Sequence, residues 1–127
     1  MIKEQEKLIN IVNDLAKQPN ESEWVEFKHN YHSAEEIGER ISALANGACL
    51  HNQPFGYLVY GIEDKTHKIL GTTFNIKSAK KGKEDIESWL INRLEPKIDF
   101  RTHCFEYKEG INISLVNIPS NYSKCHK

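Results

Sequence analysis

The chain has 127 residues, of which 39% are hydrophobic and 28% charged, and its formal net charge at pH 7 is −1. This length and composition fit one soluble globular domain and exclude an intrinsically disordered chain. The near-neutral charge excludes a strongly basic nucleic-acid-binding domain, so contacts with phosphates would have to come from local patches. No apolar run reaches about 18 residues, and the start lacks the apolar core of a secretory signal. We therefore expect no membrane span and a cytoplasmic location.

The first part of the chain predicts a helix followed by a short strand. Within residues 1–19, four apolar residues recur at helical spacing, namely Leu8, Ile11, Val12 and Leu15. Pro19 ends this helix, because proline disfavours helical backbone in the residue before it. Residues 23–28 alternate and contain aromatic and β-branched side chains, which is typical of a strand. We therefore expect an N-terminal helix over 1–19 and a domain over 20–127.

The middle of the chain predicts a second helix and a hairpin. Ser33 and Glu36 form a capping box, in which the serine hydroxyl accepts from the Glu36 backbone N–H and the glutamate reaches back. The helix that follows carries apolar and small residues on one face. Residues 56–62 form a nearly continuous apolar run, which indicates a strand covered on both faces. After a polar turn at 63–67, residues 68–71 are expected to return as the antiparallel partner of this strand.

The last third of the chain predicts a third helix and a second hairpin. Residues 83–94 carry apolar side chains at helical spacing, and Pro96 ends the helix. Residues 100–107 and 111–118 are expected to be strands joined by a tight turn. The sequence thus predicts an α/β (α+β) fold with three helices. Its sheet is mixed and largely antiparallel with about five strands, in the order α-β-α-β-β-α-β-β.

Three carboxylates raise the question of a metal site. Glu21 precedes the first predicted strand, Glu26 lies within it, and Asp64 follows the apolar strand. Carboxylate oxygens are ligands that Mg²⁺ and Mn²⁺ prefer, and a bound ion can activate water for strand cleavage. The two glutamates are five residues apart, so on an ideal strand they point to opposite faces and meet only if the chain bends. The alternative is that all three are surface charges, with Asp64 bonding its own turn.

A cluster of lysines is a candidate for contacts with phosphates. Lys77, Lys80, Lys81 and Lys83 surround Gly82. Lysines that contact phosphates make the affinity for nucleic acid fall steeply with salt. Composition alone favours a solvated loop over a binding site.

Other classes of chemistry find no support in the sequence. Neither the P-loop pattern nor the dinucleotide-binding glycine pattern is present, which argues against ATP hydrolysis. The three cysteines, Cys49, Cys104 and Cys125, include no Cys-x-x-Cys pair. We expect reduced, partly buried thiols instead of a disulfide framework.

Several segments, taken in order, resemble the Schlafen AlbA-like family, also described as a DNA-binding domain and formerly as a divergent AAA group. They are ESEWVEFK at 21–28, ISALAN at 41–46, YLVYGIED at 57–64, LGT at 70–72, GKEDIESWL at 82–90 and LEP at 94–96. The resemblance covers about residues 20–120. It implies a nucleic-acid-binding module of a bacterial regulatory or defence protein, of the transcriptional-regulator type. It also implies that the domain lacks the C-terminal continuation usual in the family.

The resemblance also bears on the carboxylates. In some animal members of the family, two glutamates five residues apart and an aspartate after the central strand form a metal-dependent ribonuclease site. Glu21, Glu26 and Asp64 match this pattern. The resemblance therefore implies that they can act as catalytic residues and as ligands of Mg²⁺ or Mn²⁺, which makes a ribonuclease the alternative function.

Two further expectations follow from the same resemblance. Lys28 matches the lysine that closes the family's Glu-Phe-Lys signature, which implies a phosphate contact or a salt bridge to Glu26 or Glu63. The animal enzymes build a basic groove from two lobes, so this single lobe is expected to form a homodimer. A dimerisation or interaction scaffold that binds no nucleic acid is a third hypothesis.

Overall fold

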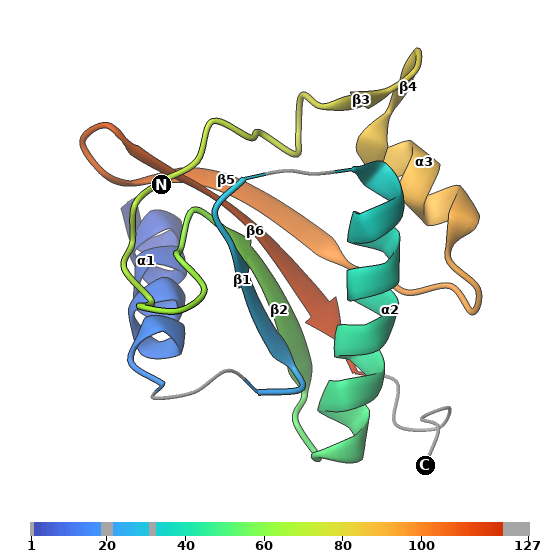
Figure 1. The fold of residues 1–127 in the computed structure, drawn as a ribbon, viewed down its shortest axis with the longest axis horizontal. Helices are drawn as coiled ribbons and strands as arrows, with labels where there is room; N and C mark the ends of the chain where they lie inside the picture. Colours follow the sequence, from blue (N-terminus) through green and yellow to red (C-terminus); the bar gives the residue numbers. More distant parts are fainter. Residues whose placement is uncertain (1, 19–21, 31–32, 121–127) are drawn as a thin grey trace.

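The protein is a sheet covered by helices on both faces. The computed structural model describes residues 2–18, 22–30 and 33–120. Helix α1 (Ile2–Ala16) covers one face of the sheet, and helices α2 (Ala34–Leu50) and α3 (Ile86–Arg93) cover the other (Figure 1). The predicted fold class and the three helices are confirmed. Among the described residues, no helix is both long and apolar enough to cross a bilayer.

The main sheet has four strands in the order β1-β2-β6-β5. Their bounds are Val25–Lys28 for β1, Phe55–Tyr60 for β2, Arg101–Lys108 for β5 and Ile111–Pro119 for β6. Strands β1 and β2 are parallel, whereas the pairs β2–β6 and β6–β5 are antiparallel. The sheet is therefore mixed and largely antiparallel, as the sequence predicts. A separate small hairpin is formed by β3 (Lys80–Lys81) and β4 (Glu84–Asp85).

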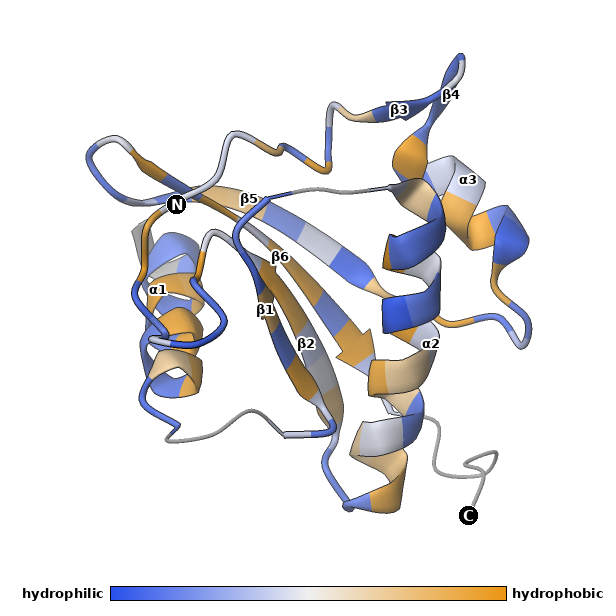
Figure 2. Cartoon of the chain, in the orientation of Figure 1, coloured by the Kyte–Doolittle hydropathy of each residue, from blue (hydrophilic) through white to orange (hydrophobic). Residues whose placement is uncertain are grey.

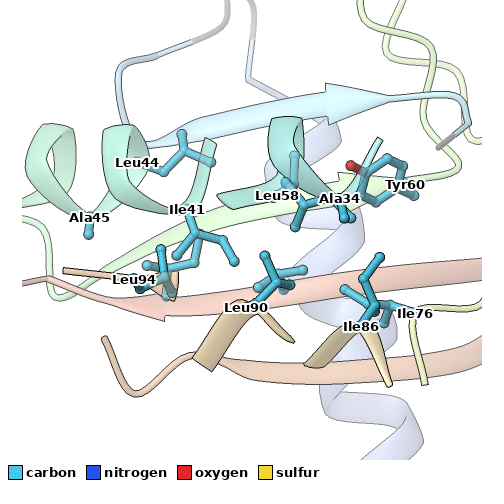
Figure 3. Packing of buried hydrophobic residues seen from close by; sticks show 13 residues of the cluster. Ala34, Ile41, Leu44, Ala45, Leu58, Tyr60, Ile76, Ile86, Leu90 and Leu94 are labelled. Atoms are coloured by element: carbon cyan, nitrogen blue, oxygen red, sulfur yellow. The ribbon is translucent and has the colours of Figure 1, made fainter. Parts of the chain in front are cut away.

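Side chains alternate along the strands and build two cores. On β2, Leu58 and Tyr60 pack against α2 and α3, whereas Val59 packs on the α1 side. Figure 2 shows that β2 and β6 are largely apolar between the helices, and Figure 3 shows how Ile41, Leu90 and their neighbours fill the space between the helices and the sheet. The same alternation on β1 buries Phe27 on the α1 side. It therefore directs Glu26 and Lys28 toward α2.

Helix α2 begins where the sequence predicts. Ser33 has an extended backbone, and its Oγ accepts a hydrogen bond of 3.1 Å from the Glu36 backbone N–H. This is the first half of the predicted capping box. The Glu36 carboxylate instead lies 3.8 Å from Lys28 Nζ on β1. The start of α2 is thus connected to β1 by charged side chains.

The predicted strand at 68–71 does not form. Ile62 and Ile69 make only an isolated bridge, and β2 is already flanked by β1 and β6. The backbone N–H groups of Leu70 and Gly71 both donate to the carbonyl of Gly61, and Gly71 has a φ of +85°, outside strand geometry. The chain then leaves the sheet edge and crosses toward β3.

Two smaller expectations also differ from the structure. Helix α3 begins at Ile86 and not at residue 83, because residues 80–85 form the β3–β4 hairpin. Cys104 is a free thiol, as expected, but Cys49 is disulfide-bonded, so the expectation of reduced thiols is wrong at that position.

Strand β5 lies at an open edge of the sheet. Asn112 of β6 accepts from the N–H of Thr72 on the side away from β5. Asn112 and its β5 partner Glu106 therefore form a non-hydrogen-bonded pair, and the backbone N–H and C=O of Glu106 point away from the sheet. The same holds for Cys104 and Thr102, two and four residues earlier on β5. In agreement with this register, the Gln5 side chain on α1 donates to the Glu106 carbonyl over 2.8 Å.

Candidate nucleic-acid interface

The β3–β4 hairpin gathers the predicted lysines at one corner of the molecule. It projects beyond the starts of α2 and α3 (Figure 1). Gly82 forms its tip with a φ of +63°, a conformation that glycine adopts without strain, and a Cβ there would meet no atom within 4 Å. Lys80 and Lys83 are exposed on either side of it. Lys83 makes no ion pair with the part of the chain that the structure describes.

Three lysines of the cluster have carboxylate partners. Lys80 Nζ lies 2.5 Å from Asp85, Lys81 Nζ lies 2.8 Å from Glu35 on α2, and Lys77 Nζ lies 3.7 Å from Glu87 on α3. These lysine side chains are 41–57% exposed. Exposed ion pairs contribute only about 0–1 kcal/mol each. A phosphate can therefore replace the carboxylate at little cost in stability.

The hydrogen bond from Lys81 has an electrostatic consequence for its partner. This bond is the main reason that the pKa of Glu35 lies below its ordinary value, and a backbone hydrogen bond adds to the effect. The positive charge of Arg93 acts in the same direction. Lys81 and Arg93 thus favour the charged form of Glu35.

Trp89 on α3 provides an aromatic surface beside the hairpin. It is half-buried and packs against the core between α2 and α3. Lys81 Nζ lies 5.7 Å from the centroid of its ring, and the guanidinium carbon of Arg93 lies 4.9 Å from it. Both are cation–π distances. Arg93 was not predicted from the sequence, although its position four residues after Trp89 on a helix places the two on one face.

Lys28 and Glu26 belong to a charged network between β1 and α2. Lys28 Nζ lies 3.8 Å from both Glu26 and Glu36, and Arg40 Nε lies 3.3 Å from Glu26. The predicted salt bridge between Lys28 and Glu26 is therefore present. Arg40 is a residue that the sequence reasoning missed. Since two carboxylates already surround Lys28, it is less available to a phosphate than the hairpin lysines.

The structure does not bring the three predicted metal ligands together among the residues that it describes. Glu21 lies outside the described residues. Glu26 faces α2 and is paired with cations, whereas Asp64 is exposed in the turn 63–67. That turn reaches the α1 side, because the ring of His67 packs on Phe27 at 4.7 Å. Within 2–18, 22–30 and 33–120, no group of three His, Cys, Asp or Glu side chains could hold a metal ion. The shared site stays a prediction.

The carboxylate next to Asp64 has a structural role in the same turn. Glu63 accepts hydrogen bonds from the backbone N–H groups of Lys65, at 2.6 Å, and of Thr66, at 3.4 Å. These bonds, led by the one from Lys65, lower the pKa of Glu63. Glu63 therefore holds the turn as an anion.

A comparison with known families identifies the family of the chain. A family model described as Schlafen, AlbA_2 matches residues 21–127. The chain belongs to the Schlafen AlbA_2 family. No curated protein matches it. The Schlafen AlbA_2 match includes the hairpin, α3 and the β1–α2 network, and it begins after α1. Membership of this family associates the chain with nucleic-acid-related domains.

Proposed function

We propose that this chain is a nucleic-acid-binding module of a regulatory or defence protein, and that the β3–β4 hairpin contacts the phosphates. The observation that supports the proposal is the presence of Lys80, Lys81 and Lys83 around Gly82 at a projecting corner. Arg93 and Trp89 extend this surface along α3. A cationic corner next to an aromatic ring suits a flexible phosphate backbone, because bases can stack while lysines follow the phosphates.

The net charge of −1 is compatible with this proposal. The lysines gather at one corner, and their carboxylate partners are held only through exposed ion pairs. Binding would therefore be local, of modest affinity and strongly dependent on salt. We propose in addition that two copies associate, since a single corner of this size offers few phosphate contacts.

The test measures the affinity of the purified chain for labelled RNA and DNA by fluorescence anisotropy, from low to physiological salt. We expect the affinity to fall steeply with salt. In a variant with Lys81→Ala and Lys83→Ala, the slope of log K against log salt should decrease by about 0.7–0.9 for each lost phosphate contact. Affinity that does not respond to salt would contradict the proposal.

A matched control carries Lys65→Ala and Lys68→Ala. Both lysines are exposed in the segment after β2, so this variant removes the same charge away from the hairpin. It should keep the wild-type affinity and slope. If it loses as much as the hairpin variant, binding depends on overall charge and not on the hairpin. A stable dimer that binds neither nucleic acid nor metal would favour the interaction scaffold.

A further inference from the structure

A polar pocket lies where the segment 70–75 crosses the end of the β5–β6 hairpin. Its volume is about 980 Å³, at the upper end of the range for ligand pockets. Thr72 fixes the crossing segment at two points: its N–H donates to the Asn112 carbonyl at 2.8 Å, and its hydroxyl donates to Asn30 Oδ1 at 2.7 Å. The Ser114 hydroxyl adds a third connection by donating to the Phe74 carbonyl at 2.7 Å. The walls of the pocket are therefore held in place before any ligand binds.

The side-chain amides in the pocket present donors. Asn75 Oδ1 accepts from the backbone N–H groups of Lys77, at 2.9 Å, and Ser78, at 3.3 Å, and from the Cys104 thiol. Asn30 Oδ1 accepts from Thr72. With their oxygens occupied, both amides leave their NH₂ groups without a hydrogen bond to the described residues. The side chain of Asn112, which is exposed, also makes none with them.

The charge of the pocket limits the class of ligand. Among its lining residues only Glu106 is formally charged, and one of its carboxylate oxygens accepts from the Gly110 N–H at 3.1 Å. A lining without lysine or arginine does not suit a phosphate or a carboxylate. Amide donors beside the half-buried ring of Phe74 suit a flat, neutral ring with carbonyl acceptors. Unpaired bases are recognised in this way, by hydrogen bonds to their edges and contact with aromatic side chains.

The pocket is connected to the lysine cluster by the chain itself. Asn75 lines the pocket, and Lys77 follows two residues later. Strand β3 then begins at Lys80 (Figure 1). Cys104 lines both this pocket and a smaller one of about 500 Å³ that includes Lys77. A single strand with phosphates on the lysines therefore has a continuous surface along which one base can reach the pocket.

We propose that this pocket is a binding site for one unpaired nucleobase and that it favours bases with carbonyl oxygens, namely uracil or thymine, cytosine and guanine, over adenine. The route of the strand rests on the proposed function, whereas the pocket's own affinity for a base does not. The two ideas can therefore be tested separately.

The first experiment titrates the isotope-labelled chain with uridine, guanosine and adenosine at millimolar concentration and high salt, and follows the NMR signals. We expect uridine and guanosine to shift the side-chain amide signals of Asn30, Asn75 and Asn112 and to bind more tightly than adenosine. Asn112→Ala should lower the affinity for uridine by about 2–10-fold, the range for one lost hydrogen bond. Asn10→Ala, which removes an exposed amide on α1, should have no effect. If no signals shift, or if the signals that shift belong to residues outside the pocket, the proposal that the pocket binds a base is wrong.

The second experiment uses oligonucleotides. Thr73→Trp places a bulky ring at an exposed position on the pocket rim. It should lower the affinity for single-stranded RNA or DNA by roughly tenfold and leave the affinity for a duplex of the same sequence unchanged, since paired bases cannot enter the pocket. The salt slope should stay that of the wild type. If Thr73→Trp leaves single-strand binding unchanged while the hairpin variant weakens it, the pocket is wrong and the proposed function stands.

Discussion

Glu26 Oε2 on β1 lies 3.3 Å from Arg40 Nε on α2. Because a guanidinium is always charged in proteins, this contact neutralises one of the carboxylates that the family pattern offers to a metal ion. Lys28 adds a second positive charge at 3.8 Å. A divalent ion at Glu26 would therefore have to displace both cations or share the carboxylate with them.

The ribonuclease alternative leads to the first prediction. Any manganese-dependent cleavage of transfer RNA by this chain should be lost when Glu26→Ala and Asp64→Ala are combined, because two of the three proposed ligands are gone. Gel analysis of the cleavage products with and without manganese measures this. Asp14→Ala combined with Glu109→Ala is the control, since both residues are exposed acids outside the proposed site and outside the β3–β4 hairpin. Cleavage that survives the Glu26 and Asp64 changes comes from another site or from a contaminant.

Two glycines of α2 should respond in opposite ways to alanine. A Cβ at Gly47 would overlap the backbone carbonyl of Glu23, whereas a Cβ at Gly38 would lie 3.5 Å from Leu90 Cδ2, an ordinary contact. Gly38→Ala should stabilise the protein by about 0.5–1 kcal/mol, the helix-propensity gain. Gly47→Ala should destabilise it by about 1–3 kcal/mol, because the backbone at Glu23, which precedes β1, must move. Urea unfolding of both variants gives the two free energies, and equal signs would contradict the packing of α2 against Glu23.

Adjacent residues of α3 provide a test of the core. Leu90 is fully buried between α2, α3 and the sheet, whereas Ile91 is 50% exposed (Figure 3). Leu90→Ala should lower the free energy of unfolding by about 2–5 kcal/mol, the range for a buried leucine. Ile91→Ala should change it by no more than about 0.5 kcal/mol. Denaturant titrations followed by circular dichroism measure both, and a comparable loss in the two variants would show that α3 does not face the core as described.

His103 on β5 should make stability depend on pH. Burial, followed by the nearby charges of Lys77 and Arg101, lowers its pKa, and Glu4 only partly opposes this. A histidine with a lowered pKa takes up its proton more readily in the unfolded chain. It therefore costs stability only as the pH falls below its ordinary pKa of about 6.5. His103→Gln should lose less stability than the wild type between neutral pH and about pH 5, with a difference below about 1 kcal/mol.

The measurement for His103 is the urea midpoint of both proteins across that interval. The other described histidines are common to the two proteins, so their contributions cancel. Parallel curves for His103→Gln and the wild type would show that the environment of His103 does not disfavour its charged form.

Most of the fold could be predicted from local patterns in the sequence. Helical spacing in α1, the Ser33 cap of α2 and the hairpin of β5 and β6 depend on neighbours a few residues apart, and all three are present. The sheet order depends on contacts between distant segments. The 68–71 segment was misassigned for that reason, since β2 takes β1 and β6 as its partners.

Some residues of the candidate interface could be predicted from the sequence, and others could not. The lysines were identified because they are close together in the sequence, and the hairpin keeps them together. The pairing of Arg40 with Glu26 joins α2 to β1 across fourteen positions, so no local pattern contains it. The pocket likewise combines residues that follow β1, that follow β2 and that begin β6, which only the folded chain brings to one place.

The hydrogen bond from Gln5 to the Glu106 carbonyl limits how the sheet can grow. An open edge strand can pair with a strand of any other chain, and natural proteins shorten such edges to avoid aggregation. Here α1 occupies the Glu106 carbonyl, the last outward carbonyl of β5 before its irregular end, whereas the outward groups of Thr102 and Cys104 lie earlier on the same edge. Helix α1, which precedes the Schlafen AlbA_2 match, thus reduces the length of the β5 edge that is open to pairing with another strand.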